Sequence, residues 1–91
     1  MLQNFPDVYL FDDTIYNNIR YGRPDATEME ILAAAETARV LDFALELREG
    51  VDTQTGEGGI RLSVGEKQRI GIARALLKGG AIILCEEATG Q

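Results

Sequence analysis

The feature that most constrains the fold of this chain is a continuous apolar run near its C-terminus. The run Ala81–Cys85 contains no polar residue and is followed directly by Glu86 and Glu87. An apolar run of this kind is typical of a strand in a parallel sheet, where both faces of the sheet are covered. A lone parallel strand has no partner within these 91 residues. We therefore expect a fragment of a larger α/β domain, mostly α-helical with a terminal buried β-strand.

Helical patterns account for most of the chain before this run. Two capping boxes, T-x-x-E and S-x-x-E, begin at Thr27 and Ser63. They predict helices over about 28–39 and 63–78, because each box satisfies two amide groups at a helix start. The other expected segments are a strand or packed loop at 8–11, short helices at 15–20 and 41–47, and a glycine-rich loop at 50–61.

Composition excludes several classes of function. Nine Lys and Arg residues against fifteen Asp and Glu give a net charge of −6, which argues against a nucleic-acid partner. The chain has no histidine and one cysteine, so Ser-His-Asp chemistry, an internal disulfide and an ordinary zinc site are excluded. No apolar run approaches the ~20 residues that cross a bilayer. We expect a reducing cytosolic setting and no transmembrane segment.

Two places carry residues suited to phosphate chemistry. The helix start at Ser63 offers amide groups, a hydroxyl and the small residue Gly65 to an anion, but simple capping explains the same residues better when they are taken alone. Glu86 and Glu87 follow the expected strand, where one carboxylate can hold Mg²⁺ through water and the other can orient or deprotonate a water. An exposed acidic turn explains that pair equally well.

Five segments follow one another in a fixed order: Leu62–Glu66, Gln68-Arg69, Ala73–Leu77, Ile82–Cys85 and Glu86–Thr89. Their order resembles that of the ABC ATPases, in which L-S-G-G-Q/E is followed by Q-R, A-R-A, a Walker B strand and D-E-A-T. Upstream, Val8–Ile19 looks like the stretch after the Q-loop of exporter-type ATPases. The resemblance covers almost the whole chain.

This resemblance implies a P-loop NTPase fold of the ABC ATPase type and a division of the chain into three parts. They are the Q-loop region and helical subdomain at 1–61, the signature motif and its helix at 62–78, and the Walker B strand with the start of the D-loop at 81–91. It also implies ATP and Mg²⁺ as cofactors. The implied partners are a second nucleotide-binding domain in a head-to-tail dimer and a transmembrane domain, at the cytoplasmic face of a membrane.

The resemblance assigns roles to individual residues. Glu87 matches the catalytic general base, and Glu86 matches the Walker B acid that supports Mg²⁺ through water. Gln3 matches the Q-loop glutamine, and the segment 3–11 would touch the coupling helix of the membrane domain. The signature residues would contact the γ-phosphate of ATP held by the opposite subunit; they are Leu62, Ser63, Val64, Gly65 and Glu66.

The sequence also departs from the family pattern. Val64 stands where the family has glycine, which permits closer approach of a phosphate, and Glu86 stands where the family has aspartate. Gln3 matches only with a three-residue insertion at 5–7; without the insertion Pro6 takes its place. The P-loop motif G-x-x-x-x-G-K-[ST] and the switch histidine do not occur in these 91 residues. We therefore expect no ATP hydrolysis by the isolated chain, because phosphoryl transfer depends on positioning of the phosphates.

Two alternative functions remain open at this stage. The chain can be a non-enzymatic helical module that binds a membrane domain or complements a P-loop half in trans. The L-S-x-G-E wording also occurs in the DNA-repair branch of these ATPases. The exporter-like segment Tyr9–Ile19, its short distance to Ser63 and the acidic charge count against that branch.

Overall fold

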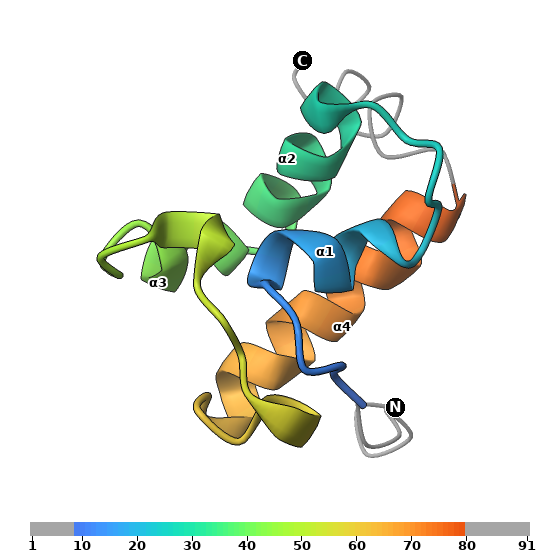
Figure 1. Ribbon diagram of the computed structural model, residues 1–91. Helices are drawn as coiled ribbons and strands as arrows, with labels where there is room; N and C mark the ends of the chain where they lie inside the picture. Colours follow the sequence, from blue (N-terminus) through green and yellow to red (C-terminus); the bar gives the residue numbers. More distant parts are fainter. Residues whose placement is uncertain (1–8, 80–91) are drawn as a thin grey trace.

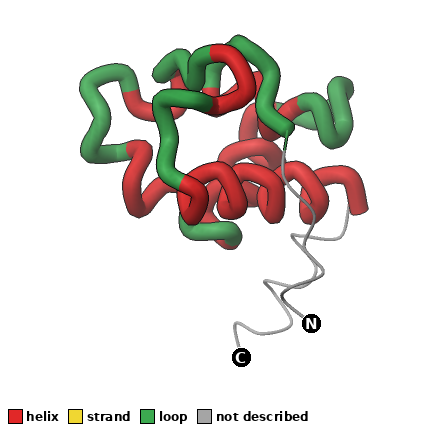
Figure 2. The backbone as a smooth tube through the Cα atoms, turned by 90° about the horizontal axis from the view of Figure 1, so that it is seen from below, coloured by secondary structure: helices red, strands yellow, loops and turns green. Residues whose placement is uncertain are grey.

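Four α-helices and two short 3₁₀ turns make up the part of the chain that the computed structural model describes, residues 9–79 (Figure 1). The longest helix, α4, contacts each of the other three. Figure 2 shows helices and loops but no strand among residues 9–79. The elements are α1 (Ile15–Arg20), α2 (Glu28–Thr37), α3 (Val40–Ala44), η2 (Gly50–Asp52), η3 (Glu57–Gly59) and α4 (Val64–Gly79).

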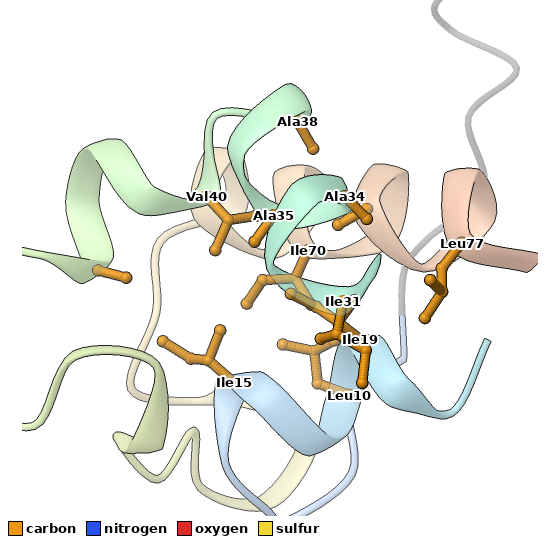
Figure 3. Packing of buried hydrophobic residues seen from close by; sticks show 12 residues of the cluster. Leu10, Ile15, Ile19, Ile31, Ala34, Ala35, Ala38, Val40, Ile70 and Leu77 are labelled. Carbon is orange, nitrogen blue, oxygen red and sulfur yellow. The ribbon is translucent and has the colours of Figure 1, made fainter. Parts of the chain in front are cut away.

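The core lies where α1, α2 and α4 meet (Figure 3). Ile15 and Ile19 from α1 are fully buried one helical turn apart, as their spacing predicts. The predicted apolar face of α4 is confirmed, since its buried residues are Ile70, Ala73 and Leu77. Alanines on the inner face of α2 add small side chains to the same cluster.

The capping residues begin the helices where the sequence predicts. Thr14 accepts the Asn17 amide and starts α1, so the predicted helix over 15–20 is confirmed. Thr27 and Glu30 form the complete capping box of α2. However, α2 ends at Thr37, earlier than the predicted Arg39, because Arg39 adopts the left-handed conformation with a φ of 67°. That residue turns the chain into α3.

Other predictions need correction. The helix predicted over 41–47 begins and ends earlier, at Val40–Ala44, and Leu45 is 73% exposed instead of packing beside Ala44. The predicted loop at 50–61 contains the two 3₁₀ turns. At 9–11 the structure has the packed loop, which is one of the two predicted alternatives, with Leu10 fully buried.

The predicted strand Ile82–Cys85 lies outside the described residues. Between residues 9 and 79 strand-like pairing is limited to one isolated antiparallel bridge, which joins Thr14 to Gln54. The Ile15 amide donates to the Thr53 carbonyl at 3.0 Å, and the Thr55 amide donates to the Asp13 carbonyl at 2.9 Å. These bonds hold the loop before α4 against the start of α1.

Candidate functional site

The N-terminus of α4 is an exposed capping box. The Ser63 amide donates to the Glu66 carboxylate at 3.0 Å, and the Glu66 amide donates to the Ser63 hydroxyl oxygen at 3.1 Å. Val64 is 66% exposed, and a Cβ atom built on Gly65 would meet nothing within 4 Å. The first amide groups of a helix have no partner within it, and they carry the positive end of the helix dipole. This end of α4 is therefore open to an anion.

The loop that leads into α4 is fixed by a buried glycine. Gly59 has a φ of +78°, and a Cβ atom there would lie 2.9 Å from the Leu10 side chain and 2.8 Å from that of Lys67. Both the left-handed backbone and the close approach require glycine at this position. Leu62 is half-buried beside the core. Of the five predicted signature residues, Leu62 thus faces inward while Ser63, Val64 and Gly65 are exposed.

Three aromatic side chains form a second exposed feature, which we call the aromatic surface: Tyr9, Phe11 and Tyr21. Their exposed fractions are 59%, 44% and 45%. The Phe11 ring meets Tyr9 edge-on at 5.2 Å between centroids and meets Tyr21 at 4.7 Å. The segment 9–11 and the end of α1 therefore contribute to one surface, although their residues are separate in sequence.

A buried polar cluster of Asn18 and Arg74 links the aromatic surface to α4. The fully buried Asn18 side chain accepts the Phe11 amide at 2.8 Å and donates to the carbonyls of Phe11 (3.1 Å) and Thr14 (2.9 Å). Arg74 donates to the Asn18 backbone carbonyl at 2.9 Å, to its side-chain oxygen at 3.1 Å and to the Tyr9 carbonyl at 3.1 Å. Its guanidinium also lies 5.8 Å from the centroid of the Phe11 ring, a cation–π distance.

Burial lowers the pKa of Arg74, but arginine stays protonated in proteins, so the cluster keeps its positive charge. The sequence predicts that Arg69 and Arg74 pair with carboxylates or pack along the helix. For Arg74 the structure shows backbone and amide partners instead. Arg69 is exposed.

Asp13 connects the start of α1 to the aromatic surface. Its carboxylate accepts the Thr14 amide at 2.7 Å, the Asn17 side-chain amide at 2.9 Å and the Tyr21 hydroxyl at 2.9 Å. The hydrogen bond from Asn17, followed by that from Thr14, holds the pKa of Asp13 below its ordinary value. The same contact with Asp13 raises the pKa of Tyr21.

The acidic residues of α2 were expected to form one solvated face. Glu28 and Glu36 are exposed, but Glu30 is half-buried and forms an ion pair with Arg23 at 3.2 Å. The amide of Thr27 and the guanidinium of Arg23 lower the pKa of Glu30. The Glu30 side chain keeps 28% of its surface exposed, and its carboxylate has a structural role at the start of α2 in addition.

Three predicted site residues lie outside the described residues: Gln3, Glu86 and Glu87. Their proposed roles stay predictions. Within residues 9–79 no group of three or more carboxylate or cysteine side chains is arranged to hold a metal ion. No helix in that range is both long and apolar enough to span a membrane.

Sequence reasoning missed Asn18 and Tyr21. The signal for Asn18 is its position, three residues after Ile15 and directly before Ile19, which places an amide on the apolar face of α1. A polar residue at such a position needs buried partners. Tyr21 has no comparable signal, because its contact with Phe11 depends on the folded loop.

Comparisons with known proteins show the family to which the chain belongs. The sequence family described as ABC transporter matches residues 2–90. The chain is 57% identical to ATP-binding cassette sub-family B member 6 of Xenopus tropicalis over 83 residues, which is 91% of this chain and 10% of that protein. It is 50% identical to ATP-dependent lipid A-core flippase 1 of Colwellia psychrerythraea over 82 residues, 90% of this chain and 14% of the flippase.

A solved structure of a bacterial Atm1-family ABC exporter with ATP bound is also similar. It superposes with a TM-score of 0.76 at 53% identity and covers 79% of this chain and 13% of that one. The chain thus spans between a tenth and a seventh of the length of these relatives. Since the family match extends over nearly every residue, this protein belongs to the ABC transporter family and corresponds to part of its ATP-binding domain.

Proposed function

We propose that this chain supplies the signature segment of an ATP-driven exporter, with Leu62–Glu66 closing on the γ-phosphate of ATP that a second nucleotide-binding domain holds. The observation that carries the proposal is the exposed N-terminus of α4, where Gly65 has open space and Val64 points to solvent. A similar solved structure that is an ABC exporter by name, and a relative that is an ATP-dependent flippase by name, support the same assignment. Residues 1–61, 62–78 and 81–91 then take the three roles given above.

The residues at this end of α4 suit a phosphate. The Ser63 hydroxyl oxygen accepts the Glu66 amide, which leaves its proton free to donate to an anion. The Glu66 carboxylate is tied to the Ser63 amide, so the box itself is preorganised. The positive end of a 16-residue helix adds a favourable field for negative charge. Val64 adds a branched side chain beside this position and lowers the strength of the contact.

The catalytic acids are proposed from the sequence alone. Glu87 would act as the general base and Glu86 would support Mg²⁺ through water, since oxygen ligands suit this cation. Gln3 would be the Q-loop residue. Bound Mg²⁺ and ATP supply the reacting phosphoryl group and neutralise its charge.

The isolated chain is expected to release no phosphate from ATP, because the P-loop motif does not occur in it. Phosphate release by the purified chain that disappears in Glu87→Gln would contradict this expectation. The Glu87→Gln variant also controls for contaminating ATPases. Phosphate release that persists in this variant would come from a contaminant, because a substitution in this chain leaves other enzymes unchanged.

The aromatic surface is the proposed contact for the transmembrane domain, at the cytoplasmic face of the membrane. Tyr9, Phe11 and Tyr21 are large and partly exposed. Asn18 and Arg74 hold the backbone of Phe11 and Tyr9, and the Tyr21 hydroxyl donates to Asp13. Aromatic residues are enriched in protein interfaces, which supports this use of the surface.

The test mixes the full 91-residue chain with a P-loop-bearing half of a related exporter whose own signature is disabled, and measures ATP binding by calorimetry. We expect no binding by the chain alone and tighter ATP binding in the mixture. Ser63→Arg should weaken ATP binding by the mixture about tenfold or more, since a hydrogen bond to a charged group contributes roughly 1.5–3 kcal/mol. Thr27→Arg is the matched control, because it breaks the corresponding capping box of α2.

Equal loss of ATP binding in Ser63→Arg and Thr27→Arg would contradict the proposal, because the loss would then result from reduced helix stability. Absence of any nucleotide effect, combined with binding to an isolated membrane domain, would favour the alternative function of a non-enzymatic interaction module.

A further inference from the structure

Helix α2 is apolar on two faces. Its inner face places Ile31, Ala34 and Ala35 in the core. Its outer side carries Met29, which is 76% exposed, and the half-buried Leu32 and Ala33. A helix with apolar residues on both sides is normally covered on both sides. The outer side of α2 thus has the character of a contact surface.

This outer side is hollowed into a groove of about 680 Å³ that follows α2 from its N-cap Thr27 to Leu41 of α3. Met29, Leu32, Ala33 and Leu41 give it an apolar lining. Its charged lining residues are Glu28 and Glu36, both exposed, and they lie two turns apart on α2. The volume lies in the range of about 300–1,000 Å³ that is typical of ligand sites.

We propose that this groove binds an amphipathic helical segment of a partner protein, with two or three apolar anchors flanked by Lys or Arg. Apolar anchors at helical spacing would fill the space over Leu32 and Leu41, as in other helix-in-groove complexes. The basic residues would face Glu28 and Glu36. This proposal is independent of the signature segment and of the aromatic surface, which use other residues.

Charge selects this occupant over the alternatives. The chain carries a net charge of −6, so an anionic lipid surface would be repelled. Two copies joined groove to groove would place the same two glutamates against each other, and opposed like charges destabilise an interface. A basic helical segment avoids both kinds of repulsion, and its positive charges are attracted to the two glutamates at the rim of the groove.

The probe is a fluorescein-labelled Leu/Lys peptide with leucines at i, i+3, i+4 and i+7, and its binding to the full chain is followed by fluorescence anisotropy. The double variant Met29→Gln, Leu32→Gln should weaken binding about tenfold or more, as expected when apolar anchors are lost. Leu45→Gln, Ile60→Gln is its control, since these residues are 73% and 79% exposed and lie outside the groove lining. Glutamine keeps a high helix propensity, so α2 remains folded.

A second pair of variants separates local charge from net charge. Glu28→Lys, Glu36→Lys should weaken binding and reduce its dependence on salt. Glu46→Lys, Glu57→Lys changes the net charge equally at exposed positions outside the groove lining and should have a smaller effect. Absence of peptide binding to the unmodified chain, or equal effects of groove and control variants, would overturn the proposal. A dimer that sedimentation detects and that Met29→Gln, Leu32→Gln dissociates would overturn it too, by identifying a second copy as the occupant.

Discussion

Replacing Asn18 by leucine should destabilise this protein far more than the same change at its neighbour Asn17. Asn18 is fully buried on α1, and its side-chain amide holds the segment 9–11 against that helix. Asn17 is half-buried, and among residues 9–79 the hydrogen-bond partners of its side chain are Asp13 and Arg20. The two positions share residue type, helix and substitution, so the difference between them isolates the buried hydrogen bonds.

The magnitude follows from the groups that lose a partner. The Thr14 carbonyl keeps the residue-18 amide as a donor at 3.0 Å. The Phe11 carbonyl stays 2.9 Å from the Thr55 hydroxyl, whose single proton it shares with the Asp13 and Gly56 carbonyls. The Phe11 amide loses its acceptor, and an unpaired buried donor costs about 1–3 kcal/mol. Arg74 loses one of its three acceptors, a charged hydrogen bond of about 1.5–3 kcal/mol. The expected loss is therefore roughly 2.5–6 kcal/mol, against about 1 kcal/mol for the Asn17 variant.

Urea unfolding followed by circular dichroism measures this difference. With a slope of about 1 kcal/mol per molar urea, the midpoint of Asn18→Leu should fall by roughly 2.5 M or more. Small domains have a free energy of unfolding of about 5–15 kcal/mol. If the unmodified chain lies near the lower end of that range, Asn18→Leu would be largely unfolded in buffer. If the two variants unfold within about 1 kcal/mol of each other, the buried hydrogen bonds do not have the importance assigned to them.

Three further predictions test other parts of the structure. Gly22→Ala should destabilise the protein by about 1–3 kcal/mol, because its Cβ would clash with the Arg74 carbonyl oxygen. Thermal unfolding of Gly65→Ala, where the Cβ has open space, is the control and should show no loss. The pKa of Asp13 in the folded protein is below its ordinary value of 3.8. Its contribution to folding stability is therefore present above pH 3.8 and is lost as the pH falls through the folded value. When thermal stability is measured over a series of acid pH values, Asp13→Asn should show a smaller decline than the unmodified chain, and equal declines would refute the assignment. Val64→Gly should strengthen ATP binding in the mixture described above by removing the branched side chain, and calorimetry showing weaker binding would contradict this role.

Local patterns predicted the helices well because their signals lie within a few residues. The capping boxes at Thr27 and Ser63 and the spacing of Ile15 and Ile19 locate the starts of α2, α4 and α1. Helix ends were less predictable. The left-handed conformation of Arg39 ends α2 early. The sequence does not indicate this turn, because the residue is an arginine and not a glycine. Leu45 has the spacing of a core residue but lies beyond the last turn of α3, where it reaches solvent.

The features of the candidate site also differ in how well the sequence predicts them, because some are local in sequence and others are not. The signature segment is contiguous, so its residue types, together with the order of the motifs that follow it, are enough to predict a phosphate contact, and that role stays a prediction. The Asn18–Arg74 cluster joins positions 56 residues apart, and such a contact has no local pattern in a single sequence. Its effect is nevertheless specific, because one guanidinium on α4 bonds both to α1 and to the segment that presents Tyr9 and Phe11. The helix that begins at the signature segment is thereby fastened to the aromatic surface, which makes α4 the rigid element shared by the two proposed contacts.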